Sequence, residues 1–445
     1  MFSYNQEPFW RIKNDSFFVM IRQASEIERL YIDFDSFFAS VEQQLQPRLR
    51  KRPIGVLPFM SKATCIIAPS REAKPYGVKT GMRIKEALAL CPDILFTPAR
   101  HDVYVRLHHQ IYQCIESCIH IDQACSIDEV VCTLLGRERN NLEALAHRIR
   151  KILTATIGTY ITCSMGFAAN RLLAKIASDF KKPKGTVIWH PQQYSEYLFT
   201  LELRDLPGIG RSMERRLHMA NIHSVKKLYS MTAENMRTIW GSIEGERFWY
   251  GLHGYAIEPI ATSRGMFGHS RILSPENRNP QDARNCARLL TVKAARRLRR
   301  DERTASTFGL SLRFENKIKW FGEEHFALAA DDHSFLNALT TLWTSAMQHN
   351  GNNKNKYPYR IKQVSISIYR LNKSEQTQGD LFSEDEQIQK TQGKQEKWLR
   401  LTQTMDEIVN KYGNKAASLG VWEDPPEGYA GAKIAFGRIP DLSDF

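Results

Sequence analysis

Two carboxylates lie two residues apart in an otherwise apolar segment, Leu30–Asp35, near the start of the chain. Residues i and i+2 of a β-strand point to the same face of a sheet, so the charges of Asp33 and Asp35 would repel each other. A divalent cation is the simplest positive partner for such a pair. The alternative is that Asp35 is the N-cap of the following helix, but this would leave Asp33 unexplained. The spacing therefore predicts a metal-dependent site at Asp33.

A second acidic pair, Asp128 and Glu129, directly precedes the β-prone segment Val130–Leu135. Adjacent side chains on a regular strand point to opposite faces, but at a strand start or a bulge both can reach one site. A solvated turn before the strand is the alternative.

The elements expected around these acids alternate between strand and helix patterns. The helix pattern 141–157 is followed by a strand pattern, 160–167, and then by an apolar helix pattern, 169–180. That helix is expected to stop at Lys181–Gly185, where Pro and Gly break the pattern and three lysines could hold an anion.

A further candidate for phosphate binding is the segment Pro207–Gly210 between two helix patterns. Pro-Gly-Ile-Gly is typical of a helix-hairpin-helix loop, in which glycines let backbone N–H groups approach a phosphate. The alternative is an uncharged structural turn. The basic residues Arg211, Lys226 and Lys227 nearby favour phosphate binding.

The net charge of the chain also points to an anionic partner. The formal charge is +14, and the pI is about 9.3. Residues 264–319 hold fourteen Lys and Arg but five Asp and Glu, a net charge of +9. An apolar stripe through Ala287, Leu290, Ala294 and Leu298 predicts a helix whose arginines occupy the other face. This one-signed surface favours nucleic acid over a merely soluble basic surface.

The last part of the chain is predicted to open as a flexible linker, with polar residues from Asn372 to Lys394. Within this linker, Gln378–Phe382 contains the apolar residues Leu381 and Phe382, which have no neighbouring apolar pattern to pack with. Such an isolated pair is suited to binding in a pocket of a partner protein. The alternative is that the pair occurs there by chance. A short helix is expected at Leu401–Tyr412, and a mainly apolar segment, Ala432–Pro440, lies near the end of the sequence.

Length and composition exclude several classes of protein. The 445 residues suggest roughly two to four domains, and 42% hydrophobic with 25% charged residues indicate a packed protein rather than a disordered one. No run of about 18 apolar residues predicts a membrane span, and the N-terminus lacks the long apolar region of a secretory signal. The eight cysteines form no CxxC pair or zinc spacing, so reduced cytoplasmic thiols are expected. A P-loop is also missing from the sequence.

Four segments, taken in order, resemble the Y-family translesion DNA polymerases, the DNA polymerase IV and UmuC-like group. They are YIDFDSFFASVE at Tyr31–Glu42, SIDE at Ser126–Glu129, GFAANRLLAKIASDFKKPKG at Gly166–Gly185 and DLPGIG at Asp205–Gly210. The resemblance covers about residues 29–371 and leaves a C-terminal extension outside it.

The resemblance implies a multi-domain α+β fold of the right-hand polymerase type. It has a palm with a ferredoxin-like sheet, small fingers, a helix-hairpin-helix thumb and an α/β little finger. The implied ranges are an N-terminal extension 1–25, palm 26–35 and 100–189, fingers 36–99, thumb 190–256, linker 257–266, little finger 267–371, flexible linker 372–400 and C-terminal extension 401–445.

The implied activity is low-fidelity, template-directed DNA synthesis past damaged DNA, with two Mg²⁺ ions per active site. By resemblance, Asp33, Asp128 and Glu129 are the catalytic carboxylates. Asp33 and Asp128 would bridge both metals, Glu129 would complete the primer-side metal site, and the carbonyl of Phe34 would help to hold the triphosphate metal. Asp35 is not expected to be a principal ligand.

The resemblance also implies residues that bind the nucleotide. Phe38 occupies the steric-gate position, which predicts selection of dNTPs over rNTPs, and Lys182 matches a triphosphate-binding lysine with Lys175 as a neighbour. The fingers depart from the family's S-Y-x-A-R string, because here it reads Ser-Arg-Glu-Ala-Lys. Arg71 and Lys74 are expected to bind the triphosphate, although lysine cannot form the bidentate fork of arginine.

The implied partners are primer-template DNA, dNTPs and the bacterial sliding clamp, for a cytoplasmic, nucleoid-associated, monomeric protein without a membrane role. The DNA contacts are expected at Gly208, Gly210, Arg296, Arg297, Arg299 and Arg300, and the clamp contacts at Gln378, Leu381 and Phe382. Two alternatives are a non-catalytic Y-family-like adaptor that binds DNA and clamp in a mutasome, and a helix-hairpin-helix nuclease. Adaptors typically lose the acids that this chain keeps.

Overall fold

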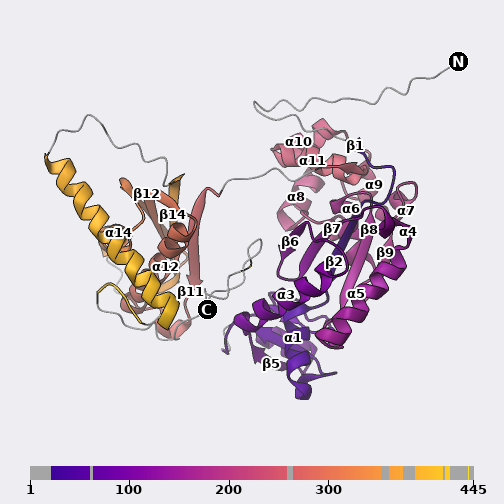
Figure 1. Cartoon of the computed structure of the whole chain (residues 1–445), viewed down its shortest axis with the longest axis horizontal. Helices are drawn as coiled ribbons and strands as arrows, with labels where there is room; N and C mark the ends of the chain where they lie inside the picture. Colours follow the sequence, from indigo (N-terminus) through magenta and orange to yellow (C-terminus); the bar gives the residue numbers. More distant parts are fainter. Residues whose placement is uncertain are drawn as a thin grey trace. The chain divides into compact units, whose positions relative to one another are not determined.

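The computed structural model describes residues 22–60, 64–257, 264–351, 360–373, 386–413, 416–420 and 439. The chain forms two compact units, one of residues 1–260 with 431–445 and the other of residues 261–430 (Figure 1). Each unit is described by itself below. The multi-domain α+β fold expected from the sequence is confirmed.

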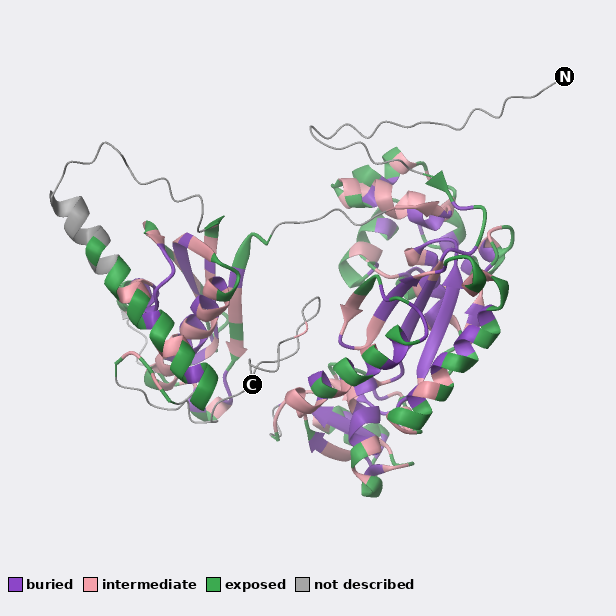
Figure 2. Cartoon of the chain, in the orientation of Figure 1, coloured by how far each residue is buried: buried purple, intermediate pink, exposed green. Residues whose placement is uncertain are grey.

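A five-stranded sheet, here called the palm sheet, forms the centre of the first unit. Its strand order is β6-β7-β2-β8-β9, in which only β8 and β9 pair in parallel. The strands are β2 (Arg29–Phe34), β6 (Gln123–Ser126), β7 (Glu129–Thr133), β8 (Cys163–Ala168) and β9 (Thr186–Ile188). Figure 2 shows the middle of this sheet as buried.

The two faces of the palm sheet are covered by different helices. Leu30, Ile32 and Phe34 of β2 join a core with α3 (His101–Glu116) and α5 (Leu142–Thr156). Tyr31 points to the other face and packs with residues of α6 (Arg171–Phe180). Because side chains alternate along a strand, Asp33 lies on the α6 face. The short helix α4 (Arg137–Asn140) precedes α5.

The helix after β2 begins differently from one alternative considered above. Ser36 occupies the N-cap position of α1 (Phe37–Leu45), in a left-handed conformation with φ 49°. Asp35 is therefore not the N-cap. Its carboxylate instead accepts hydrogen bonds from Thr162 Oγ1 at 2.9 Å and Ser164 Oγ at 2.8 Å, so this buried acid has hydrogen-bond partners for both of its oxygens.

The range predicted as fingers contains a small three-stranded sheet of order β4-β3-β5. Its elements are β3 (Ile54–Leu57), β4 (Ala68–Pro69), β5 (Leu95–Pro98), α2 (Ile84–Leu90) and the 3₁₀ turns Pro47–Leu49 and Lys74–Tyr76. The turn Lys74–Tyr76 begins at the last residue of the segment that departs from the family pattern.

The range predicted as thumb is a compact set of helices. They are α7 (Tyr194–Leu198), the 3₁₀ turn Leu203–Asp205, α8 (Arg211–Met219), α9 (Val225–Tyr229), α10 (Ala233–Trp240) and α11 (Ile243–Leu252). Asn170, the N-cap of α6, donates to the carbonyls of Gly251 and Tyr255 at 2.8 and 2.9 Å. This side chain ties the thumb helices to the palm. Part of the predicted N-terminal extension also belongs here, because β1 (Arg22–Gln23) pairs with β10 (Tyr255–Ala256).

The second unit has three layers. A four-stranded sheet of order β11-β14-β12-β13 carries α12 and α13 on one face, and α14 packs on these helices (Figure 1). The elements are β11 (Met266–Ile272), the 3₁₀ turn Pro275–Asn277, α12 (Pro280–Arg300), β12 (Arg303–Phe314), β13 (Lys319–Ala329), α13 (Asp332–Gly351), β14 (Ile361–Lys373) and α14 (Glu386–Tyr412).

The prediction of a flexible linker up to residue 400 with a short helix at 401–412 was wrong in its bounds. Helix α14 begins at Glu386 and is part of the second unit. Trp398 packs against His333 with 4.0 Å between ring centroids, and Thr402 and Val409 are buried. The spacing of these contacts, at 398, 402 and 409, is that of one helix face. The C-terminal extension therefore supplies a layer of this unit.

The predicted exposed arginine face of α12 is also wrong in part, because α14 covers it. Arg299 donates to Asp406 Oδ2 at 2.7 Å and to Asp332 Oδ1 at 2.7 Å, and its side chain is 7% exposed. Arg296 pairs with Asp406 Oδ1 at 2.9 Å. A nearly buried guanidinium with two carboxylate partners cannot grip DNA phosphates, so the prediction that Arg299 contacts DNA is wrong. Arg296 is 18% exposed and pairs with the same Asp406 carboxylate, and it is left out of the DNA contacts proposed below.

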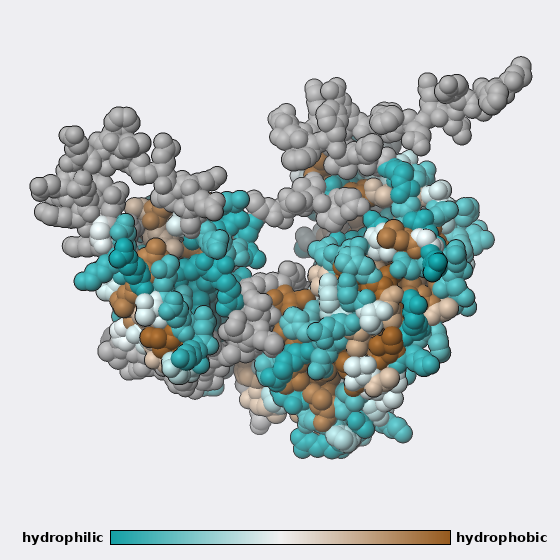
Figure 3. All heavy atoms as spheres, in the orientation of Figure 1, coloured by the Kyte–Doolittle hydropathy of each residue, from teal (hydrophilic) through white to brown (hydrophobic). Residues whose placement is uncertain are grey.

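No helix in the described part of the chain is long and apolar enough to cross a membrane. Hydrophilic residues cover most of the face seen in Figure 3, with small apolar patches between them. All eight cysteines are free thiols, as their spacing predicted.

Candidate active site

Strand pairing brings the two acidic segments together. Asp33 on β2 lies directly opposite Glu129, the first residue of β7, so both side chains lie on the α6 face. Asp128 precedes it in the turn between β6 and β7, and its carbonyl accepts from the N–H of Phe34 at 2.9 Å. The sequence-based expectation that a strand start allows both acids of the second pair to approach Asp33 fits this hairpin.

Helix α6 lies close to the sheet at this point. A Cβ at Gly166 of β8 would collide with the backbone of Ala174 and Ser178, so only glycine permits this approach. The approach places Lys175 and Asp179, one helical turn apart, over the carboxylates of β2 and β7. Lys182 follows shortly after the end of α6.

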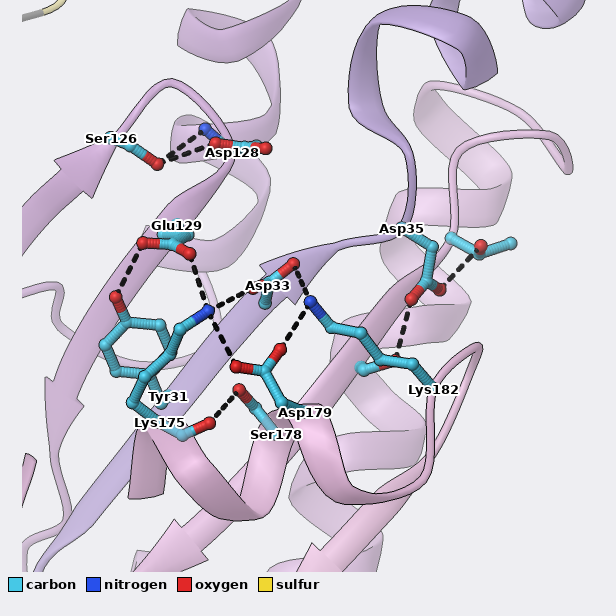
Figure 4. A network of polar contacts seen from close by, with 12 residues as sticks. Tyr31, Asp33, Asp35, Ser126, Asp128, Glu129, Lys175, Ser178, Asp179 and Lys182 are labelled. Atoms are coloured by element: carbon cyan, nitrogen blue, oxygen red, sulfur yellow. Dashed lines mark hydrogen bonds and ion pairs between the residues drawn. The ribbon is translucent and has the colours of Figure 1, made fainter. Parts of the chain in front are cut away.

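Two lysines neutralise the carboxylates (Figure 4). Lys175 Nζ lies 2.5 Å from Asp33 Oδ2, 2.6 Å from Glu129 Oε1 and 3.2 Å from Asp179 Oδ2. Lys182 Nζ lies 2.6 Å from both Asp33 Oδ1 and Asp179 Oδ1. Burial alone would lower the pKa of Lys175, but the three carboxylates outweigh it and raise that pKa. The pKa of Lys182 is raised for the same reason, so both lysines are charged.

Glu129 is held in its ionised form. Its Oε2 accepts a hydrogen bond from Tyr31 OH at 2.8 Å. Burial alone would raise the pKa of Glu129, but the ammonium of Lys175 and the hydrogen bonds from Lys175 and Tyr31 lower it. Tyr31 lies two residues before Asp33 on the same face of β2, and the sequence analysis did not single it out.

Asp128 has a different environment from the other two acids. Burial raises the pKa of Asp128 to about 6, although Ser126 Oγ donates to its Oδ1 at 2.6 Å. Its carboxylate lies near Asp33 and Glu129 but does not share their lysine contacts (Figure 4). Among the described residues, no group of three His, Cys, Asp or Glu side chains converges tightly enough to form a ready-made metal site.

The donor set nevertheless fits a hard divalent cation. The side chains in this set, those of Asp33, Asp128 and Glu129, are all carboxylates, which Mg²⁺ and similar ions prefer as ligands. Asp33 and Glu129 already share one cation, the Lys175 ammonium, so their oxygens converge on a single point. Asp33 is 5% exposed, and a carboxylate in such a place requires a positive partner, which Lys175 and Lys182 supply in this structure.

The ring of Phe38 on α1 is half-buried, and one of its faces packs against another aromatic ring. It stacks on Tyr104 with 4.5 Å between centroids and 13° between planes. Tyr104 OH donates to Glu42 Oε1 at 2.8 Å, and Arg100 forms a two-pronged pair with Glu42 at 3.1 and 2.6 Å. The fully buried Glu42 therefore fixes the wall against which Phe38 rests. The sequence analysis did not find Tyr104 or Glu42.

The two basic residues of the fingers approach the same region. Arg71 Nη1 donates at 3.1 Å to Thr162 Oγ1, which itself donates to Asp35. Loss of solvation and the neighbouring positive charge of Lys182 lower the pKa of Lys74. Both residues therefore lie beside the lysine-carboxylate network, where an anionic ligand would meet several positive charges.

The remaining predicted contacts lie in the loop before α8, on α12 and in the segment that follows β14 in the sequence. Gly208 sits in a turn with φ +90°, which a residue with a Cβ rarely adopts, and both it and Gly210 are exposed. Arg297 contacts His269 at 3.2 Å, and Arg300 is exposed at the end of α12. The segment with Gln378, Leu381 and Phe382 lies outside the described residues.

Comparison with known proteins gives matches along most of the chain. Residues 32–179 match the impB/mucB/samB family, residues 204–255 match a DNA polymerase-iota thumb domain, and residues 264–381 match the impB/mucB/samB family C-terminal domain. The two matches to impB/mucB/samB descriptions together span more than half of the chain.

Curated relatives are named DNA polymerase IV. One from Bacteroides fragilis is 30% identical over 246 residues, which cover 54% of this chain and 65% of the relative. This alignment therefore spans just under two thirds of that relative's length. One from Moorella thermoacetica is 27% identical over 409 residues, which cover 88% of this chain and 95% of the relative.

A solved structure of a Y-family DNA polymerase chimera has a similar fold. Its TM-score is 0.63 at 21% sequence identity, and the match covers 78% of this chain and 100% of the chimera.

Proposed function

This chain belongs to the impB/mucB/samB family, the Y family of DNA polymerases, and from that premise we propose that it is a DNA polymerase. It adds dNTPs to a primer 3′ end under the direction of a template and copies damaged DNA with low fidelity. The observation that carries this proposal is the meeting of Asp33 and Glu129 opposite each other on β2 and β7, with Asp128 beside them and Lys182 in the same network.

These residues suit nucleotidyl transfer. We infer that Asp33, Asp128, Glu129 and the carbonyl of Phe34 hold two Mg²⁺ ions. When bound, the two ions activate the primer 3′ oxygen and neutralise the leaving pyrophosphate. Lys182, with Arg71 and Lys74, supplies further positive charge for the triphosphate.

The alternative is a non-catalytic adaptor that binds DNA and clamp. That role needs no carboxylate cluster. In this chain two lysines form ion pairs with Asp33, and Tyr31 donates a hydrogen bond to Glu129. We therefore favour the enzyme.

Primer extension tests the proposal. With dNTPs and Mg²⁺ we expect the primer to lengthen, and with EDTA in excess of the metal we expect no extension, restored by added Mg²⁺. An unchanged primer under all conditions supports the adaptor, and a shortened primer supports a nuclease.

The half-buried ring of Phe38 is proposed to select the sugar of the nucleotide. Replacement Phe38→Ala removes the ring that would collide with a 2′-hydroxyl, and we expect the preference for dNTPs over rNTPs to fall by at least about tenfold, or ~1.4 kcal/mol. The ratio of kcat/KM for dCTP and CTP opposite template G measures this. Phe248→Ala, in the thumb helix α11, is the matched control. If sugar discrimination is unchanged in the Phe38 variant, the assignment is wrong.

DNA contacts are proposed at the exposed hairpin loop and at the remaining arginines of α12. Gly208 and Gly210 offer backbone N–H groups at the start of α8, which suits a phosphate. Arg297 and Arg300 stay in the proposed set. We propose that the protein acts as a monomer on DNA of the nucleoid, in the cytoplasm.

Gln378, Leu381 and Phe382 are proposed to bind a bacterial sliding clamp. The double variant Leu381→Ala and Phe382→Ala removes both apolar anchors, so we expect clamp binding to weaken at least about tenfold in surface plasmon resonance. Distributive primer extension without clamp should be unchanged. Retained clamp binding would mean that the match is a coincidence.

A further inference from the structure

Asp179 near the end of α6 is the second anionic partner of both active-site lysines. Its Oδ1 lies 2.6 Å from Lys182 Nζ, and its Oδ2 lies 3.2 Å from Lys175 Nζ. The same two ammonium groups contact Asp33, Lys175 through Oδ2 and Lys182 through Oδ1. Figure 4 shows Asp179 and Asp33 on either side of the two lysines, so that each lysine bridges these two carboxylates, and Lys175 contacts Glu129 as well.

This arrangement matters because both oxygens of Asp33 are engaged by ammonium groups. If Asp33 takes a divalent metal ion, as proposed above, the positive charge of that ion repels the two ammonium groups and weakens their contacts with Asp33. A charged lysine without a partner in this partly buried place would be costly, since Lys175 is 17% exposed. Asp179 already contacts both lysines and needs no rearrangement to keep them in place.

Helix stability does not explain an acid at this position. Asp179 lies in the last turn of α6, where a negative charge opposes the helix dipole. Its pair with Lys175 has the lysine N-terminal to the acid, which is the less favourable order for a pair four residues apart. A residue that breaks two local preferences at once points to a role in the site.

We propose that Asp179 is a positioning residue: it retains the ammonium groups of Lys175 and Lys182 at the active site when Asp33 binds metal, and so keeps Lys182 in reach of the incoming triphosphate. This inference rests on the proposed polymerase function. It predicts that loss of the Asp179 charge weakens nucleotide binding more than it slows the chemical step.

The test compares Asp179→Asn, Asp179→Glu and wild type. Asp102→Asn is the matched control, because Asp102 forms an exposed pair with Arg106 at 2.7 Å on α3, four residues apart. Binding is measured without turnover, as the Kd of the complementary dNTP for the enzyme with a dideoxy-terminated primer-template. Insertion kinetics with an ordinary primer give kcat and KM, and thermal unfolding is followed on the metal-free protein.

We expect Asp179→Asn to raise the dNTP Kd about tenfold, with a much smaller change in kcat, and Asp179→Glu to restore most of the affinity. The unfolding midpoint of the metal-free protein should stay close to that of wild type, because Asp33 still pairs with both lysines there and the lost charge opposed the helix dipole. An unchanged Kd, or a lowered midpoint with equal losses in both variants, would overturn the inference. If wild type itself neither binds dNTP nor extends the primer, the proposed function fails instead.

Discussion

Glu129→Gln should lower the rate of nucleotide insertion by about 10³-fold, or ~4 kcal/mol, while leaving the protein folded. The substitution keeps the size of the side chain and an oxygen that can accept from Tyr31 OH, which lies 2.8 Å from Glu129 Oε2. What it removes is the negative charge that Lys175 contacts at 2.6 Å. A metal ion held by one carboxylate fewer would be bound more weakly and placed less accurately over the primer end.

Single-turnover insertion on a primer-template measures this effect. Glu143→Gln is the matched control, because Glu143 is an exposed acid in the first turn of α5 on the other side of the palm sheet. The control should insert nucleotides at the wild-type rate. If Glu129→Gln retained more than about a tenth of wild-type activity, Glu129 would not be a principal metal ligand.

Asp406→Ala should destabilise the second unit by about 2–3 kcal/mol. The Asp406 carboxylate lies 2.7 Å from Arg299 and 2.9 Å from Arg296, and it links α14 to α12. Arg299 is nearly buried, so removal of this carboxylate leaves a charge with fewer partners. The remaining ion pair with Asp332, at 2.7 Å, limits the loss to less than that of a fully unpaired ion.

Calorimetry on the full chain is the measurement. We expect the transition of the second unit to fall by about 5–10 °C and that of the first unit to stay in place. Glu407→Ala, at the exposed neighbouring position, should move neither transition. If the two variants unfold alike, α14 does not depend on this ion pair, and Arg296 and Arg299 return as candidates for DNA contact.

The acidic centre could be predicted from the sequence because strand alternation is a short-range rule. The spacing of Asp33 and Asp35, and the place of Glu129 at a strand start, were visible in the residues. The order of the strands in the sheet, which puts Glu129 opposite Asp33, was implied only by the family resemblance. The role of Asp35 was less clear, because its partners Thr162 and Ser164 lie about 130 residues away.

The charged surface of the second unit was harder to predict. The residue pattern of α12 shows which face is apolar, but it does not show whether another element covers the arginine face. Arginines opposite an apolar stripe normally face solvent, but α14 contacts this face through Asp406 and packs on α13 through Trp398. The first residues of α14 are polar and lack an apolar stripe, so the sequence did not predict that the helix begins at Glu386. The net charge of residues 264–319 therefore overestimated the positive charge available for DNA, since Arg296 and Arg299 pair with Asp406 and Asp332, which lie outside that range.

Supporting residues were missed for a related reason. Tyr104 and Glu42 look like core residues of two amphipathic helices, and their role appears only when α1 and α3 are placed side by side. Asp179 was part of a quoted motif but carried no separate signal, except that it stands at a helix end where an acid is unfavourable.

The central claim is template-directed nucleotide transfer by this chain. The most direct measurement offers each dNTP separately, with Mg²⁺, on four primer-templates that differ only in the templating base. We predict that each primer grows by one nucleotide fastest with the complementary dNTP. A primer that stays unchanged although the DNA is bound, that becomes shorter, or that grows regardless of the template base would contradict the claim.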